Sequence, residues 1–406
     1  MTAFDPTAFR AQFPSLESGI AHFDGPGGTQ TPARVGEAIA RTLTGPLSNR
    51  GGSVASEANA EAAVAAFRRA YADLLGCAPE GVVYGRSATQ LTYDFSRHLS
   101  QGWGPGDEVV VTRLDHDSNV RPWVQAAERT GAAVRWIDFD PATAEPDLSD
   151  LDAVVNPRTR LVAVGAASNL LGTRFPVRAV ADRAHAVGAL VYVDGVHHAA
   201  HAVVDVRELG ADFYVCSPYK FLGPHCAVLA AAPALLETVV PDKLVPSTDA
   251  VPERFEFGTL PYETMAGAAE AVEVLADLAP GDGGRRARLA AARLLLEEHE
   301  TALRDRVEAG LAGLGGAVRV HSRAAERTPT LFMTFPGRRS TDVSRFLAER
   351  GVLAPAGSFY AYEAFARLAP DDTAGLRVGM APYSSEEDVD RLLTGLADAL
   401  RGRAVR

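Results

Sequence analysis

The sequence is poor in lysine. Of its 40 basic residues only Lys220 and Lys243 are lysines, and the rest are arginines. Arginine carries a permanent charge and serves wherever charge alone is needed, whereas a buried lysine can lose its proton and act as a nucleophile. A surface lysine retained by chance is the alternative. The scarcity therefore singles out the segment around Lys220, "DFYVCSPYKFLGPHC" (212–226).

Other scarcities exclude whole classes of protein. The three cysteines (Cys77, Cys216 and Cys226) form no CxxC pair, so neither a disulfide framework nor a zinc site is expected, and we predict no metal. No apolar run reaches the ~18 residues of a membrane-spanning helix. The net charge of −11 argues against nucleic acid and anionic membrane surfaces. The N-terminus lacks a basic start with an apolar stretch, so we expect a cytoplasmic protein.

Short β-branched runs alternate with amphipathic, helix-like stretches through the first two thirds of the chain. This alternation predicts an α/β fold with a mostly parallel sheet, and the nearly continuous apolar character predicts strands buried on both faces. Helices are expected over 120–131 and 177–188, where each stretch ends in glycine after a basic last turn. The predicted strands cover 81–85, 107–112, 132–139, 159–166, 188–195, 212–217 and 227–231.

The pattern changes at "LAPGDGGRR" (278–286), a break rich in glycine and proline. A long helix is expected over 287–315, then strands near 317–322 and 329–335, and an amphipathic terminal helix. Because 406 residues exceed one minimal core, we predict more than one domain. The predicted units are an N-terminal arm (1–20) packing on the small domain, a large domain (21–280) and a small α+β domain (281–406).

Lys220 follows the predicted strand 212–217 at its carboxyl end, where parallel sheets bind ligands. Ser217 precedes it in an S-x-x-K arrangement, and Asp194 ends another strand, "LVYVDG". An aspartate and a lysine at the ends of strands in one sheet suit pyridoxal 5'-phosphate (PLP): the lysine holds the aldehyde, and the aspartate pairs with the pyridine nitrogen. The S-x-x-K of penicillin-binding enzymes does not match, because their SDN and KTG motifs are absent.

Further motifs follow one another in a fixed order. They are "HFDGPGGTQTP" (22–32), "YGRSATQLTYDFSRHL" (84–99), "LDHDSNVRPW" (114–123), "ASNLLGTRFPV" (167–177), "VDGVHHAAH" (193–201), "SPYKFLGP" (217–224), "RFEFGTLP" (254–261) and "LRVGMAPYSSEEDVDRL" (376–392). With them the chain, from about residue 20 to 395, resembles the class V aminotransferase-fold PLP enzymes, most closely the cysteine desulfurase and selenocysteine lyase branch. The resemblance implies the PLP-dependent transferase fold (fold type I), with a large domain built on a seven-stranded-type sheet.

The resemblance also implies roles around the cofactor ring. Lys220 becomes the Schiff-base lysine, and Asp194 the partner of the pyridinium nitrogen. His116 stacks on the ring, Asn169 donates to the phenolic oxygen, and His197 takes the position of the family's glutamine or histidine.

For the cofactor phosphate, the resemblance implies Ala88 and Thr89 at a helix N-terminus, a natural anion site, although a simple helix cap is the alternative. Ser217 is a further phosphate ligand, and Tyr219 replaces the family's usual histidine. Gly258 and Thr259 are implied to reach the phosphate of a neighbouring subunit, which makes the protein a homodimer with shared active sites.

On the substrate side, the resemblance implies that Arg377 clamps the carboxylate of a small amino acid, a bidentate task suited to guanidinium. The loop 351–365 departs from the family, because Tyr360 stands where desulfurases carry their cysteine and no cysteine follows Cys226. Transfer of sulfur as a persulfide needs a reactive thiolate. Cys216 lies inside an apolar run and is expected to be a buried structural residue.

Three hypotheses follow. The first is a PLP-dependent enzyme that cleaves a C–S or C–Se bond of a small amino acid by β-elimination. Its cofactor is then covalently anchored at Lys220. Tyr360 or Tyr362 is then a candidate loop acid, against the simpler reading of a packing residue. The second is an aminotransferase or an amino-acid epimerase in a specialised pathway. The third is a non-catalytic partner protein with the PLP fold, which the retained carboxylate clamp at Arg377 disfavours.

Overall fold

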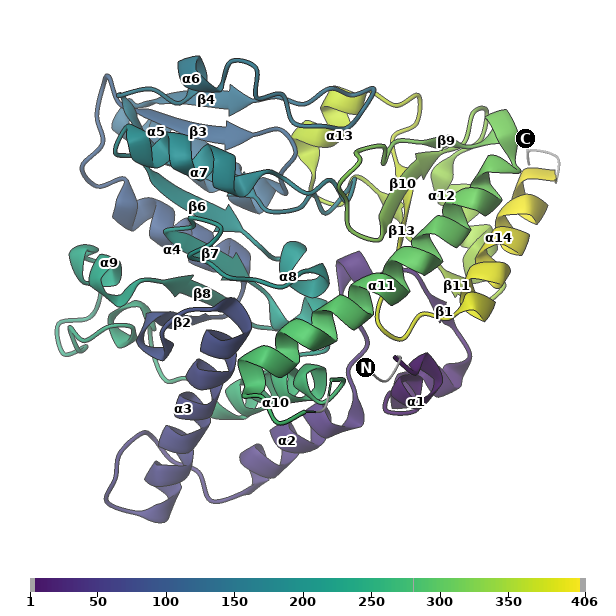
Figure 1. Cartoon of the computed structure of the whole chain (residues 1–406). Helices are drawn as coiled ribbons and strands as arrows, with labels where there is room; N and C mark the ends of the chain where they lie inside the picture. Colours follow the sequence, from purple (N-terminus) through teal and green to yellow (C-terminus); the bar gives the residue numbers. More distant parts are fainter. Residues whose placement is uncertain (1–3, 280, 402–406) are drawn as a thin grey trace.

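A central sheet of seven strands organises the protein (Figure 1). The computed structural model describes residues 4–279 and 281–401. The strand order is β2-β8-β7-β6-β5-β3-β4; β8 runs antiparallel to both its neighbours, and the remaining pairs are parallel. The strands are β2 (Val82–Gly85), β3 (Glu108–Thr112), β4 (Ala133–Ile137), β5 (Thr159–Gly165), β6 (Leu190–Asp194), β7 (Phe213–Cys216) and β8 (Ala227–Ala231). The predicted α/β class with a mostly parallel sheet is confirmed.

Each of the seven predicted β-branched runs forms one strand of this sheet. The expected burial on both faces holds for β3, β7 and β8. It is wrong for β4, where Ala133 and Arg135 are exposed. The physical reason is that β4 is an edge strand, and Arg135 reaches back to Glu108 on β3 at 3.0 Å. Charged side chains on an edge strand also discourage pairing with other chains.

Helices cover both faces of the sheet (Figure 1). On one face, α4 (Ala88–Leu99) and α5 (Arg121–Thr130) pack Phe95 and Trp123 against alternate strand residues such as Val111. On the other face lie α3 (Ala55–Leu75), α7 (Val177–Ala186) and α10 (Tyr262–Ala276). The predicted end of α5 is confirmed, because Gly131 closes the helix at φ 78°, a left-handed conformation that glycine adopts without strain.

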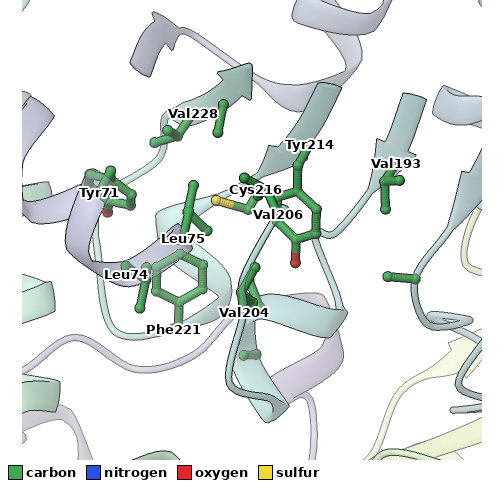
Figure 2. Packing of buried hydrophobic residues seen from close by; sticks show 14 of the residues in the cluster. Tyr71, Leu74, Leu75, Val193, Val204, Val206, Tyr214, Cys216, Phe221 and Val228 are labelled. Atoms are coloured by element: carbon green, nitrogen blue, oxygen red, sulfur yellow. The ribbon is translucent and has the colours of Figure 1, made fainter. Parts of the chain in front are cut away.

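Figure 2 shows the core beneath this second face, where Cys216 of β7 lies among Tyr214, Phe221 and Leu75. The Cys216 side chain is fully buried, and burial raises the pKa of its thiol well above the usual value. Cys226 is buried in the same cluster. The expectation that Cys216 is a buried structural residue is confirmed.

The C-terminal third forms a second, four-stranded antiparallel sheet in the order β12-β13-β10-β9. Its core, which includes Leu303, Leu331 and Leu392, joins the sheet to the helices around it. The elements are α11 (Arg285–Ala312), β9 (Arg319–Val320), β10 (Thr330–Thr334), α12 (Ser340–Ala348), β11 (Val352–Leu353), β12 (Ala356–Gly357), α13 (Tyr362–Leu368), β13 (Gly375–Gly379) and α14 (Glu386–Arg401). The long helix, the two strands and the terminal helix that the sequence predicts are thus all confirmed.

The N-terminal segment lies against this second sheet. β1 (Ala21–His22) pairs in parallel with β11, although the predicted division placed residues 21–22 in the large domain. Before it, Arg10 at the end of α1 (Pro6–Arg10) forms an ion pair with Asp388 at 2.7 Å. The domain boundaries themselves stay a prediction. The remaining helices are α2 (Ala33–Thr44), α6 (Leu151–Val154), α8 (His198–His201) and α9 (Pro233–Thr238). Among the described residues, no helix is long and apolar enough to cross a membrane.

Candidate active site

A cavity of about 670 Å³ lies at the carboxyl ends of the parallel strands, against the C-terminal sheet. We call it the inner cavity. Most of the residues predicted from the sequence line it: Ala88, Thr89, His116, Asn169, Asp194, His197, Ser217, Tyr219, Lys220, Tyr360 and Arg377. Gly258 and Thr259 do not line it; both are exposed on a loop elsewhere on the chain. Their predicted part in a neighbouring subunit's site stays a prediction.

The sheet explains why distant residues meet here. β6 ends at Asp194, β7 ends one residue before Ser217, and the carboxyl ends of parallel strands share one edge. Gly165 at the end of β5 pairs in register with Asp194. A Cβ at Gly165 would lie 2.6 Å from the carboxylate of Asp115, so glycine leaves the space that this buried side chain occupies.

Lys220 closes a short 3-10 turn directly after β7. Its Nζ donates a hydrogen bond to the backbone carbonyl of Pro26 at 2.5 Å. Burial, and then the positive charge of Arg377, lower the pKa of Lys220 to about 7, while the carboxylate of Asp194 opposes the shift. A substantial share of Lys220 is therefore a neutral amine near neutral pH, which arginine could not provide.

Two buried carboxyl groups line the inner cavity. Asp194 is only 8% exposed, its Oδ1 accepts a hydrogen bond from the Val196 N–H at 2.9 Å, and burial raises its pKa to about 6. Asp115 accepts hydrogen bonds from the Gly165 N–H (2.7 Å) and from Asn119 (2.8 Å). Burial, and then the charge of Asp194, raise the pKa of Asp115 well above its usual value. Sequence reasoning missed Asp115, although it immediately precedes His116.

His116 presents a neutral ring to the cavity. Its Nδ1 accepts a hydrogen bond from the Ser118 N–H at 3.1 Å and lies 2.7 Å from the Ser118 hydroxyl. Burial, and then the charges of Lys220 and Arg377, lower the pKa of His116 to about 4. The ring stacks on Tyr360, with centroids 5.4 Å apart and planes 26° apart. An uncharged flat ring is suited to cover the face of another ring.

The first turn of α4 forms one wall of the inner cavity, with Ala88 buried and Thr89 exposed. Ser87 is the N-cap and accepts the N–H of Gln90 at 3.1 Å. The S-x-x-Q spacing of this pair is a capping signature that sequence reasoning could have used to add Ser87 to the site. Tyr219 lines the same cavity and stacks on His225, with ring centroids 4.8 Å apart.

Arg377 and Asn169 each have one buried polar atom whose hydrogen bond a bound ligand would supply. Arg377 of β13 donates from Nη1 to the Asn169 carbonyl at 2.9 Å and lies 3.8 Å from the centre of the Phe359 ring. Its Nε and the Oδ1 of Asn169 are buried without a hydrogen-bond partner among the described residues. An unsatisfied buried polar atom costs roughly 1–3 kcal/mol, which a bound ligand can recover. Burial lowers the pKa of Arg377 to about 9.

His197 faces the C-terminal sheet. Its Nε2 lies 2.9 Å from the Thr328 hydroxyl and 3.2 Å from that of Thr330. Burial, followed by the neighbouring His201, lowers the pKa of His197 well below its usual value. A neutral His197 therefore links the end of β6 to β10 across the floor of the cavity.

The loop that carries Tyr360 provides no thiol. Phe359 and Tyr360 adopt left-handed φ angles of 55° and 57°, and the Tyr360 side chain is 76% exposed. The chain's three cysteines are free, and none lines the inner cavity. Sequence reasoning assigned no role to Phe359, yet this side chain covers the guanidinium of Arg377.

These features define an enzyme active site that is built around a lysine amine with a lowered pKa. The donor set fits pyridoxal phosphate: Lys220 suits its aldehyde, Asp194 its ring nitrogen, and the α4 N-terminus its phosphate. The unpartnered Oδ1 of Asn169 and Nε of Arg377 support a bound group in the same cavity. Among the described residues, no cluster of metal-ligating side chains was found.

Comparison with known proteins places this site in a family. The family model "Aminotransferase class-V" matches residues 21–392, and the chain belongs to that family of PLP-dependent enzymes. It is 31% identical to protein MT3887 of Mycobacterium tuberculosis, over 97% of this chain and 99% of the relative. It is 30% identical to the cysteine desulfurase CsdA of Escherichia coli, over 98% and 99%. The crystal structure of that CsdA matches with a TM-score of 0.86 at 28% identity, covering 98% of this chain and 99% of the other.

Proposed function

We propose that the protein is a PLP-dependent lyase that cleaves the C–S bond of a small amino acid by β-elimination, without a persulfide on the protein. One observation carries the proposal: the inner cavity unites Lys220, Asp194 and Arg377, yet holds no thiol. The named function of the Escherichia coli relative, a cysteine desulfurase, supports chemistry at a C–S bond. The aromatic loop in place of a thiol supports an outcome other than transfer of sulfur to the protein.

Within this proposal, Lys220 is the proton carrier. The bound cofactor supplies an electron sink for the substrate's α-carbon. Lys220 would hold the cofactor's aldehyde, and its Nζ would take the α-proton of the substrate. Its lowered pKa favours the neutral amine needed for that step near neutral pH. Asp194 would hold a negative charge toward the cofactor's ring nitrogen, and His116 would offer its uncharged ring to the cofactor.

The other residues position cofactor and substrate. Arg377 clamps the α-carboxylate through its guanidinium, whose Nε has no partner among the described residues. The phosphate and ring contacts are proposed for Ala88, Thr89, Asn169, His197, Ser217 and Tyr219. Tyr360, stacked on His116 at the open side, is proposed to face the substrate and shield the site from water.

We further propose a homodimer in which Gly258 and Thr259 complete the partner's cavity. The same segment of the chain exposes Val240, Leu244 and Val245, the last by 99%, and exposed apolar clusters mark interaction surfaces. Mixing inactive Lys220→Ala with impaired Thr259→Ala protein tests this arrangement. Exchange of subunits restores one intact site if the sites are shared, and leaves the summed activity unchanged if they are not. A cytoplasmic location is consistent with three free cysteines and is tested by cell fractionation.

The test of the proposed reaction is product analysis with the holoenzyme and S-methyl-L-cysteine. Formation of pyruvate, ammonia and methanethiol in equal amounts, together with its loss in Lys220→Ala, supports β-elimination. Accumulation of pyridoxamine phosphate would instead identify an aminotransferase. Exchange of the α-proton for solvent deuterium, with no other product, would identify an epimerase. An unchanged cofactor spectrum with every amino acid tried would favour a non-catalytic protein.

A further inference from the structure

A second hollow opens directly outside the inner cavity. It measures about 590 Å³, and we call it the outer chamber. Its walls are Asp117, Arg121, Ser358, Phe359, Tyr360 and Tyr362. Asp117, Arg121, Phe359 and Tyr360 line the inner cavity as well, so the two spaces adjoin at these residues. A substrate whose α-carboxylate lies at Arg377 can therefore extend its side chain past Tyr360 into the outer chamber.

Aromatic rings dominate one wall of the outer chamber. Tyr360 is 76% exposed and Tyr362 is 64% exposed, and both line this one hollow, so they form a local exposed aromatic patch of the kind that marks a binding surface. Two hydrogen bonds hold the loop in place. Asn169 donates to the Phe359 carbonyl at 2.9 Å, and the Asp117 N–H donates to the Tyr360 carbonyl at 2.7 Å.

The backbone conformation of this loop indicates that its aromatic rings serve a binding function. Phe359 and Tyr360 are consecutive aromatic residues in the left-handed region, which bulky residues rarely occupy. Such strain persists where surrounding contacts enforce it, and it clusters at ligand-binding sites. The rings are therefore presented in fixed directions, rather than being free to collapse onto the surface.

The charges on the wall of the outer chamber are already paired. Arg121 forms ion pairs with Asp117 at 2.7 Å and with Glu363 at 3.1 Å. Its guanidinium lies 5.8 Å from the centre of the Tyr362 ring. Glu363 is shared with Arg113 at 2.8 Å. Because each charge has an opposite partner, the chamber favours a neutral planar group over an anionic or cationic one.

We infer that the substrate carries a neutral aromatic group on its sulfur, as in an S-aryl-L-cysteine, and that the outer chamber holds this group against Tyr360 and Tyr362. The inference rests on the proposed β-elimination and names its substrate class. An unsubstituted cysteine leaves the outer chamber filled with water, whereas an aryl group occupies it and stacks on the exposed rings. Tyr362 is then a specificity-determining residue.

The proposed reaction balances without any further reagent. Lys220 takes the proton from Cα, the Cβ–S bond breaks, and its electron pair leaves with the sulfur as an arylthiolate. The thiolate takes up a proton and leaves as the arylthiol. One water molecule hydrolyses the three-carbon remainder to pyruvate and ammonium. No bond is reduced or oxidised by an outside agent, and no acceptor thiol on the protein takes part.

Parallel titrations of the holoenzyme with S-phenyl-L-cysteine and S-methyl-L-cysteine test the inference. The cofactor absorbance reports binding, and pyruvate reports turnover. We expect the phenyl compound to bind at least about tenfold more tightly, the range that one apolar pocket supplies. Tyr362→Ala should remove most of this preference, and Tyr362→Phe, which keeps the ring, should retain it. Leu294→Ala, on an exposed face of α11, is the control with unchanged values for both compounds.

The two readouts separate this inference from the proposed reaction. Equal binding of the phenyl and methyl compounds, or a phenyl preference that Tyr362→Ala leaves intact, overturns the inference even if both compounds yield pyruvate. A Tyr362-dependent phenyl preference without pyruvate from either compound keeps the aromatic specificity and rejects β-elimination. A Tyr362-dependent preference together with pyruvate supports both.

Discussion

The side-chain amide of Asn169 donates a hydrogen bond to the backbone carbonyl of Phe359 across 2.9 Å. This contact joins the loop after β5 to the loop in which the desulfurase branch is expected to carry its cysteine. Phe359 in turn covers Arg377, and Tyr360 covers His116. The aromatic loop is thus tied into the inner cavity by several contacts, so its residues belong to the site and not to a neutral surface.

The anchor of this loop is open to a direct test at Glu363. Its carboxylate pairs with Arg113 at 2.8 Å and Arg121 at 3.1 Å, and the side chain is largely buried. We expect Glu363→Gln to weaken the closed loop by about 1 kcal/mol, or about fivefold in the opening equilibrium. Hydrogen exchange of the 357–363 amides should therefore accelerate. Glu349→Gln, on an exposed residue, is the control; equal exchange in both variants contradicts the anchoring role.

The role of Lys220 can be tested against a matched control, because Lys243 is the one other lysine in the sequence. Lys220→Arg keeps the charge but cannot lose it, so both Lys220→Arg and Lys220→Ala should lose the covalent cofactor absorbance. Turnover should fall by at least about a thousandfold, within the range assigned to general acid–base groups. Lys243→Ala, whose ammonium contacts the Ser247 carbonyl on a surface loop, should behave as the unaltered protein. Activity retained in Lys220→Arg would show that another group carries the proton.

Arg377 should control the affinity for substrates that carry an α-carboxylate. We expect Arg377→Gln to raise KM about 100-fold, because two charge-assisted hydrogen bonds contribute roughly 3 kcal/mol together. The same variant should discriminate little between a substrate and its α-carboxamide, whereas the unaltered protein prefers the carboxylate. Arg367→Gln removes a half-exposed partner of Asp138 and serves as the matched control. A carboxylate preference that survives in Arg377→Gln rules out the proposed clamp.

His198 should make stability depend on pH. Burial, and then the charge of Arg174, lower the pKa of His198 to about 3, while its Nδ1 lies 3.0 Å from the Tyr214 hydroxyl. The unfolded chain takes up this proton near pH 6.5 and the folded chain does not, so acidification favours unfolding. Between about pH 7.5 and about pH 5.5, the group should remove about 1.4 kcal/mol of unfolding free energy.

Urea unfolding of the cofactor-saturated protein at these two values, compared with His198→Gln, measures the effect. The difference between the two pH values should be about 1.4 kcal/mol smaller in the variant. An identical pH dependence in both proteins contradicts a neutral, buried His198.

The sheet was predictable because its strands are short β-branched runs separated by clear helix stops, such as Gly131. The cavity was predictable in outline, because Asp194 ends one strand and Lys220 closely follows the end of its neighbour on the same edge of the sheet. The edge position of β4 was not, since strand order is set by long-range packing that no local pattern encodes. Asp115 and Phe359 were missed for the same reason. Their roles depend on Gly165 and Arg377, which are distant in sequence and close only in the fold.

The central claim is C–S cleavage without a protein thiol, and it is tested most directly with L-cysteine and a variant lacking all three cysteines. Cys77, Cys216 and Cys226 are replaced by alanine, and the three-carbon product is identified. The account predicts pyruvate and ammonia from the variant and from the unaltered protein, together with no persulfide in the mass spectrum of the unaltered protein. That spectrum decides the matter even if the variant folds poorly. Alanine as the product, or a persulfide on any cysteine, would contradict the account.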